Sequence, residues 1–345
     1  MNILLIGGSS RLMDSMILKL RKEGHRVFLL TGDMYRHNKY QKVFERYDFS
    51  YDCENLNDIL DSVNADVTIL TGAFDTNYNW NGEERETVHF MSHLVNILVA
   101  SSVAGKGRVI FLSSDEIYSG NHVNDIEEDE AFSGTGQKAD TLSQAEEMCE
   151  NFRVNRNMDI VTLRLDHLYG IPKEKKDVDN IVAQMCLECM KDGHIKAGLN
   201  HIFSVLDEND AVEYIYQIVK AGQHKYARYH LSSNDIVSEM QLAAMVQKEI
   251  GGESNLVEVP DVSGRCVLSG RRFEEEFGMH AFGDIQKNVK NMVAYMKKHK
   301  SVFLNEEERK APWWERMLNK WKWLIAALFP FFENMVCFIP FFMMN

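Results

Sequence analysis

The chain begins with the stretch Met1-Asn2-Ile3-Leu4-Leu5-Ile6-Gly7-Gly8-Ser9-Ser10-Arg11-Leu12-Met13. Its apolar run predicts a buried strand, and the two glycines predict a tight turn that leads into a helix. A dinucleotide-binding βαβ unit begins in this way, with small residues at three spaced positions. In G-x-x-G-x-x-G spacing those positions hold Gly7, Ser10 and Met13. The stretch therefore predicts the fold, whereas two of the three glycines that favour the cofactor are replaced.

The rest of the first 170 residues alternates between apolar strands and helices. We expect strands at residues 2–6, 25–30, 65–70, 108–112 and 159–164, and helices at 12–23, 84–104 and 140–153. Such alternation predicts an α/β fold with a doubly wound parallel sheet, because each crossover between parallel strands needs a helix. Beyond residue 170 the pattern is mixed, with helices expected near 178–191, 208–220, 239–250 and 285–298. We therefore predict one domain at residues 1–300, with a Rossmann-like core at 1–170 and a smaller mixed lobe at 171–300.

Composition and charge exclude several classes of protein. The net charge of −13 argues against a nucleic-acid surface, since phosphate neutralisation needs clustered Lys and Arg. Six cysteines scattered over 345 residues favour reduced thiols in a cytosolic setting over a disulfide framework. Cys186 and Cys189 have C-x-x-C spacing without a second pair, so we predict no metal there. His89 and His93 lack a third ligand in motif spacing, and we expect them on a solvated helix face.

Several later segments resemble the extended short-chain dehydrogenase/reductase family, the NAD-dependent sugar-nucleotide epimerases and dehydratases. The segments are residues 109–118 with the run Ser113-Ser114-Asp115, residues 163–170, 205–212, 229–233 and 271–278. Together with the opening turn they follow the family's order over about residues 1 to 300. The resemblance implies a Rossmann-like fold and, in a working member, NAD or NADP as cofactor and a nucleotide sugar as substrate.

The resemblance also implies a catalytic Ser or Thr, and a Tyr and a Lys four residues apart on one helix face. Ser114 occupies the first position, and counting through the following loop brings the Tyr and Lys positions to Asp140 and Gln144. Asp has an ordinary pKa of about 3.9 against about 10 for Tyr, and Gln carries no charge to tune a neighbour. Lys138 precedes this pair and is given no role. We therefore expect no intact catalytic residue, with Ser114, Asp140 and Gln144 as degenerate counterparts.

The cofactor side is altered in the same way. If a dinucleotide is retained, the resemblance implies that it contacts Gly7, Gly8, Ser10, Asp52, Gly72 and Ala73. Met13 would place a bulky side chain where helix, strand and diphosphate converge. We therefore expect no cofactor, with NAD or NADP as the alternative.

The composition changes again after residue 311. A basic, aromatic segment at 312–323 precedes a run at 324–344 that is apolar except for Glu333 and Asn334. The run is long enough to span a bilayer, and Trp with Lys or Arg at one end is typical of a membrane interface. Pro330, Pro340 and Glu333 disfavour one straight span.

Three interpretations of this tail therefore stay open: a single span, an in-plane helix over 313–329 followed by the start of a span, and a helix packed on the domain. We expect a linker at 301–311 and a membrane-associated segment, or the start of a transmembrane segment, at 312–345. Positive charge ahead of the run places the domain on the cytoplasmic face of the membrane.

Two functions follow from these observations. The first is a pseudoenzyme that serves as a scaffold or ligand-sensing domain of a membrane protein. Its order of domain and tail resembles the fused regulators of bacterial exopolysaccharide synthesis of the Pel type, of which the chain would be the N-terminal module. That resemblance implies polysaccharide-synthesis proteins as partners, and the family's habit implies a homodimer. The alternative is an active NAD(P)-dependent nucleotide-sugar epimerase or dehydratase with a displaced acid/base such as Asp140.

Overall fold

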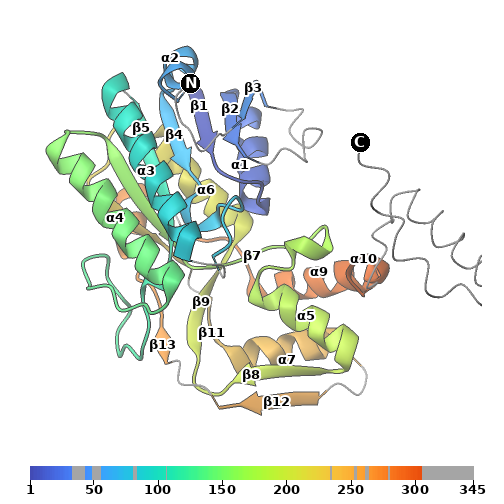
Figure 1. Ribbon diagram of the computed structural model, residues 1–345. Helices are drawn as coiled ribbons and strands as arrows, with labels where there is room; N and C mark the ends of the chain where they lie inside the picture. Colours follow the sequence, from blue (N-terminus) through green and yellow to red (C-terminus); the bar gives the residue numbers. More distant parts are fainter. Residues whose placement is uncertain are drawn as a thin grey trace, which may run out of the picture. The chain divides into compact units, whose positions relative to one another are not determined.

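A parallel sheet of seven strands forms the centre of the described chain in the computed structural model (Figure 1). The structure describes residues 1–32, 43–48, 56–80, 84–105, 107–233, 235–251, 255–260, 264–278 and 280–304. The strands of the sheet are β1 Asn2–Ile6, β2 Arg26–Thr31, β3 Glu45–Asp48, β4 Val67–Leu70, β5 Arg108–Ser114, β6 Ile160–Leu165 and β10 Arg228–Leu231. Their order is β10-β6-β5-β4-β1-β2-β3, and all neighbours run parallel. The predicted doubly wound α/β sheet is confirmed.

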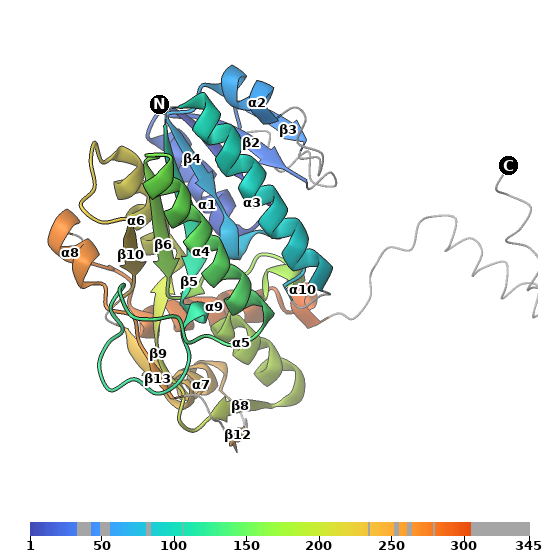
Figure 2. The ribbon, with the colours of Figure 1, turned by 60° about the vertical axis from the view of Figure 1, so that its left-hand side comes forward.

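Helices cover both faces of this sheet (Figures 1 and 2). One face carries α1 Arg11–Lys22, α6 Glu208–Lys220 and α8 Arg271–Phe277, and the other carries α2 Leu56–Val63, α3 Glu84–Ala104 and α4 Gln137–Asn155. Strands β4, β5 and β6 are buried along their whole length. Burial on both faces explains why their sequences are continuous apolar runs instead of alternating patterns.

A smaller lobe lies at the carboxyl ends of the central strands, below the sheet in Figure 1. Its strands are β7 His167–Tyr169, β8 His194–Gly198, β9 Ile202–Asp207, β11 Ile236–Ser238, β12 Asn255–Val259 and β13 Arg265–Cys266. Its helices are α5 Ile181–Asp192, α7 Glu239–Ile250 and α9 Ile285–Lys298. Three short 3₁₀ helices, η3 Gly72–Phe74, η4 Asp115–Ile117 and η5 Lys175–Asp177, lie in the loops. The mixed character predicted beyond residue 170 is confirmed.

The elements of the core begin and end close to the predicted residues. The predicted helices at 84–104, 208–220, 239–250 and 285–298 match α3, α6, α7 and α9 to the residue. Strand β3 and the short strands of the lobe were not predicted, because stretches of two to six residues carry too little pattern.

The chain divides into one compact unit at Met1–Lys300 and a second at Ser301–Asn345. A short helix, α10 Lys300–Leu304, covers the beginning of the expected linker, and the predicted membrane segment lies outside the described residues. Among the described helices, α3 has one stretch, Arg85–Ala104, that is long and apolar enough to cross a membrane. That helix packs against the sheet between α2 and α4, as a core helix does.

A buried ion pair joins α4 to the sheet. Arg164 of β6 has no exposed surface, and its guanidinium donates to the Glu146 carboxylate of α4 at 2.7 and 3.0 Å. The same guanidinium donates to the hydroxyl of Tyr118 and to the carbonyl oxygen of Glu128 at 3.0 Å. One side chain therefore holds a strand, a helix and the loop after β5 together.

This pair makes a quantitative prediction. Glu146→Ala leaves a buried guanidinium without its counter-charge, and should lower the free energy of unfolding by about 3–5 kcal/mol in urea denaturation. Glu150→Ala is the matched control, since Glu150 pairs with Arg153 on the half-exposed side of the same helix. The control should lose about 0–1 kcal/mol. Equal losses in the two variants would contradict the assignment.

Candidate functional site

The opening glycine turn is covered by the segment that follows β4. Gly7 has a φ of +146°, and a Cβ added there would overlap the Thr71 hydroxyl. A Cβ at Gly8 would lie 2.6 Å from the backbone nitrogen of Asn77. Both glycines are therefore required by the chain's own packing.

A carboxylate lies on the turn. The backbone N–H of Gly8 donates to Asp75 Oδ1 at 2.7 Å, and that of Asn77 donates to the same oxygen at 2.9 Å. Asp75 is buried, and burial raises its pKa to about 6, although the two N–H groups act in the opposite direction.

The other predicted residues on this side serve packing and capping. Ser10 Oγ accepts from the backbone N–H of Met13 at 3.1 Å and so caps α1. Met13 is fully buried in the core beneath α1, so its bulk fills the helix–sheet interface. A Cβ at Gly72 would overlap the carbonyl oxygen of Leu112, and Ala73 is buried in η3. Asp52 lies outside the described residues.

Aromatic and imidazole groups fill most of the space between the glycine turn, the segment after β4 and α3. The Tyr78 hydroxyl is hydrogen-bonded to His93 Nδ1 at 2.5 Å, and the Phe90 ring meets the Tyr78 ring edge-on. The expectation of a solvated His93 is wrong: it is 3% exposed, and burial lowers its pKa to about 4. The space left beside Gly7 and Asp75 is about 20 Å³, room for about one water molecule.

A second, larger cleft lies where the core meets the lobe. It has a volume of about 820 Å³. Its lining includes side chains from η4, the start of α4, β7, the residue before β9, and β13, namely Asp115, Glu116, Tyr118, Gln137, Lys138, His167, His201 and Cys266. It opens at the carboxyl ends of the strands, where α/β sheets bind ligands.

The cleft contains a half-buried imidazole paired with a buried carboxylate. His167 forms an ion pair with Asp115, and the neighbouring Asp166 accepts from the Ser232 hydroxyl at 2.7 Å and from that of Ser204. Burial alone would lower the pKa of His167, but Asp115 raises it to about 9. Burial and the nearby Asp115 raise the pKa of Asp166. The pair therefore places a protonated imidazole at the wall of the cleft at neutral pH.

Lys138 is the cation that α4 contributes to the cleft. It lies in the first turn of the helix, and its ammonium nitrogen is 2.7 Å from Glu116 Oε1. Ser114 is buried at the end of β5, and its hydroxyl oxygen accepts from the Glu116 N–H at 3.1 Å, capping η4.

Two predicted counterparts face away from the cleft. Asp140 and Gln144 are exposed on the solvent side of α4. Glu146 turns the opposite side of the helix inward to Arg164, and residues four and eight positions earlier share its face. Those positions hold Leu142, which is fully buried, and Lys138. Asp140 and Gln144 therefore point to solvent, and Lys138, which the sequence analysis gave no role, lines the cleft instead.

Three of the buried groups have the spacing of metal ligands. One ligand atom each from Asp115, Asp166 and His167 lies within 4.8 Å of the others. These atoms already pair with one another or with Ser204 and Ser232. We assign the cluster to the cleft's hydrogen-bonded wall, and the C-x-x-C thiols are buried within α5.

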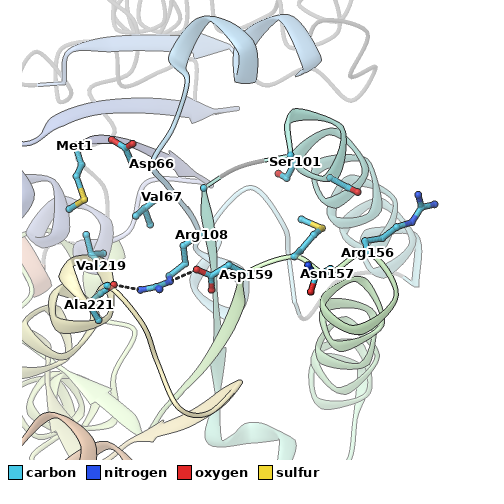
Figure 3. A pocket seen from close by; sticks show the side chains of 15 residues that line it. Met1, Asp66, Val67, Ser101, Arg108, Arg156, Asn157, Asp159, Val219 and Ala221 are labelled. Atoms are coloured by element: carbon cyan, nitrogen blue, oxygen red, sulfur yellow. Dashed lines mark hydrogen bonds and ion pairs between the residues drawn. The ribbon is translucent and has the colours of Figure 1, made fainter.

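Another cavity, of about 430 Å³, lies at the amino ends of the central strands. Figure 3 shows the side chains that line it. Its central cation, Arg108, donates to Asp159 at 3.0 Å and to the carbonyl oxygens of Ile218 and Ala221 at 2.7 Å each. The guanidinium therefore joins the carboxyl end of α6 to the start of β5. We therefore assign Arg108 a structural role.

Sequence reasoning missed Asp75, Lys138, His167, His201 and Cys266. A signal exists for two of them. Asp75 follows the strand β4 by five residues, and His167 follows β6 by two, so both lie at carboxyl strand ends. The other three come from the start of α4, from the residue before β9 and from the short strand β13.

The imidazole–carboxylate pair is testable by NMR titration of the histidine rings. Asp115→Asn should lower the pKa of His167 by about 1–3. In the native chain the pair should stabilise the fold fully below pH about 6.5, and this contribution should be lost as pH rises through the raised pKa of His167, about 9. Asp140→Asn, on the exposed side of α4, is the control and should leave the titration unchanged. An unchanged His167 in Asp115→Asn would refute the pairing.

Comparisons with known proteins agree with this geometry. A family model described as the NAD dependent epimerase/dehydratase family matches residues 3–236. A search of curated proteins by sequence finds no match to the chain.

Solved structures share the fold at low identity. The NAD complex of dTDP-glucose 4,6-dehydratase from Bacillus anthracis is 12% identical with a TM-score of 0.74, covering 88% of this chain and 98% of that one. The UDP-glucose 4-epimerase of Thermotoga maritima with UDP-glucose is 16% identical with a TM-score of 0.75, covering 87% and 100%. The UDP-N-acetylglucosamine 4-epimerase of Bacillus cereus is 15% identical with a TM-score of 0.69, covering 86% and 99%. The family match extends over more than half of the chain, which therefore belongs to the NAD-dependent epimerase/dehydratase family.

Proposed function

We propose that the chain is a ligand-sensing member of this family that does not transfer hydride. The observation that carries the proposal is the inward face of α4, on which Lys138 lines the cleft and Leu142 is buried in the core. An acid/base tyrosine needs a free phenol beside a lysine to exchange a proton. The sequence has no Tyr between Tyr118 and Tyr169. The Tyr118 hydroxyl does not substitute, because it is bound to the buried Arg164.

The glycine turn gives independent support. A dinucleotide diphosphate needs the backbone N–H groups of the turn and open space above them. Here the Gly8 N–H is bound to Asp75, and the space beside it is about 20 Å³. The turn as it stands does not fit NAD or NADP, and we derive no chemical step through either.

The larger cleft suits a small anionic ligand. Its volume of about 820 Å³ falls within the range of about 300–1,000 Å³ typical of ligand sites. Lys138 and the protonated His167 contribute positive charge, each beside a carboxylate, Glu116 and Asp115, that can accept from sugar hydroxyls. The related Thermotoga maritima structure holds UDP-glucose. We therefore take a nucleotide sugar as the ligand class.

We propose that a second copy of the chain binds through α3 and α4. Val88, Val99 and Val103 lie along one exposed side of α3, and Val154 is exposed on α4. Uncovered apolar residues on adjacent helices favour burial in a symmetric dimer. Polysaccharide-synthesis proteins remain the proposed heterologous partners.

Binding experiments separate sensing from catalysis. Calorimetry of the purified chain with UDP-glucose, NAD and NADP should detect the nucleotide sugar alone. Lys138→Met should weaken UDP-glucose binding about tenfold, equivalent to about 1.4 kcal/mol. Gln144→Ala, on the exposed side of the same helix, should bind as the native chain does. Micromolar NAD affinity together with turnover would overturn the proposal.

One observation favours the second candidate, an active epimerase or dehydratase. Asp115 and His167 form a proton-holding pair at the cleft wall that a displaced acid/base would need. Asp140 is too exposed on the far side of α4 to serve. Incubation of the chain with NAD and UDP-glucose, followed by NMR of the sugar, distinguishes this candidate by the appearance of a new sugar product.

The membrane location is proposed from the composition of residues 312–345, which lie outside the described residues. Removing the residues after 311 should transfer the chain from the membrane fraction to the supernatant on centrifugation of lysed cells. The control is Glu333→Gln, which keeps the whole segment and should stay in the membrane fraction. Unchanged membrane association of the truncated chain would refute the proposal.

A further inference from the structure

The Gly7–Gly8 turn already has an anion bound to it. The Asp75 carboxylate accepts from the Gly8 N–H at 2.7 Å and from the Asn77 N–H at 2.9 Å. No ion pair to Asp75 is found among the described residues, although the side chain is only 8% exposed. The carboxylate is therefore stabilised by backbone N–H groups, one of which, that of Gly8, lies on the turn that leads into α1, whose amino end carries partial positive charge.

The neighbours of Asp75 extend this contact across the crevice. The Thr76 hydroxyl donates to the carbonyl oxygen of Ser9 at 3.2 Å. A Cβ at Gly32, after β2, would lie 3.1 Å from Asn77 Oδ1. The three consecutive residues Asp75, Thr76 and Asn77 thus reach from the glycine turn to the end of β2, the course that a bound dinucleotide follows.

The position of the segment in the topology makes this closure effective. The chain runs from β1 outward to β2 and β3 and then returns to β4 on the other side of β1. The crevice for a nucleotide lies at this reversal of strand order. Asp75 follows β4 directly after η3, so a short loop places its carboxylate over the reversal.

We propose that Asp75 is a built-in substitute for a nucleotide phosphate, an autoinhibitory contact that closes the turn, and that removing its carboxylate opens the turn to an external phosphate-bearing ligand. The ligand class is a nucleoside diphosphate or dinucleotide, because the turn offers backbone N–H groups and no base-specific side chain. The inference concerns the turn alone and holds whether or not the larger cleft binds a nucleotide sugar.

The test is calorimetry of the full chain with ADP, NAD and inorganic phosphate. The native chain should give no signal, and Asp75→Ala should bind ADP at least tenfold more tightly than the native chain. Asp75→Asn retains an acceptor oxygen of the same length, and should leave the turn closed and ADP unbound. Absence of ADP binding in folded Asp75→Ala, with native circular dichroism, would overturn the inference.

Asp210→Ala is the matched control for non-specific loosening. The Asp210 carboxylate also accepts from two backbone N–H groups, those of Phe282 at 3.1 Å and Gly283 at 2.7 Å, far along the chain from the glycine turn. Its removal should leave ADP binding absent. A gain of ADP binding in Asp210→Ala equal to that in Asp75→Ala would also overturn the inference.

A folding defect in Asp75→Ala leaves the inference testable. Refolding is then compared in phosphate and in chloride at equal ionic strength, with Asp210→Ala treated identically to account for general salt effects. Recovery of Asp75→Ala in phosphate, beyond that of Asp210→Ala, supports an anion site at the turn. Equal recovery of both variants, or none of Asp75→Ala, refutes it. Failure here leaves the native chain's response to UDP-glucose and NAD as a separate result for the proposed function.

Discussion

The buried pair of Arg164 and Glu146 is the interaction on which the site depends. It fixes the rotation of α4 about its axis, because a charged carboxylate inside the protein must face its guanidinium. Once Glu146 points inward, Lys138 and Leu142 share its face and Asp140 and Gln144 point to solvent. The same guanidinium donates to the hydroxyl of Tyr118, the tyrosine that lines the cleft. One ion pair thus determines which groups reach the cleft.

Under the proposed function, the two ends of the site differ from a working one for different physical reasons. On the side of α4, the inward positions carry the cation Lys138 and the buried Leu142. On the side of the glycine turn, the backbone N–H of Gly8 donates to Asp75. The turn keeps its preference for an anion, but the chain itself supplies that anion.

The fold could be predicted from sequence because it depends on local pattern. Apolar runs of four to seven residues separated by helices predict a parallel sheet with helices on both faces. The direction of the side chains on α4 could not be predicted in this way. Glu146 and Asp140 are both carboxylates in a helix that has polar residues on all sides. Their difference arises from a partner 18 residues away, and the contact between Gly8 and Asp75 joins residues 67 apart. Pairings of that kind come from tertiary packing, which the spacing of a motif does not contain.

The walls of the cleft are held in place by structural contacts. Here the wall is formed by η4, which is capped by Ser114, by the Asp115–His167 pair, and by a helix tied to β6 through Arg164. None of these contacts needs a tyrosine at the start of α4 or an open glycine turn. Selection on the cleft for binding is therefore physically separable from selection for hydride transfer. The closed turn then stabilises the core directly, because Thr71, Asp75 and Asn77 fill space that a cofactor would otherwise have to occupy.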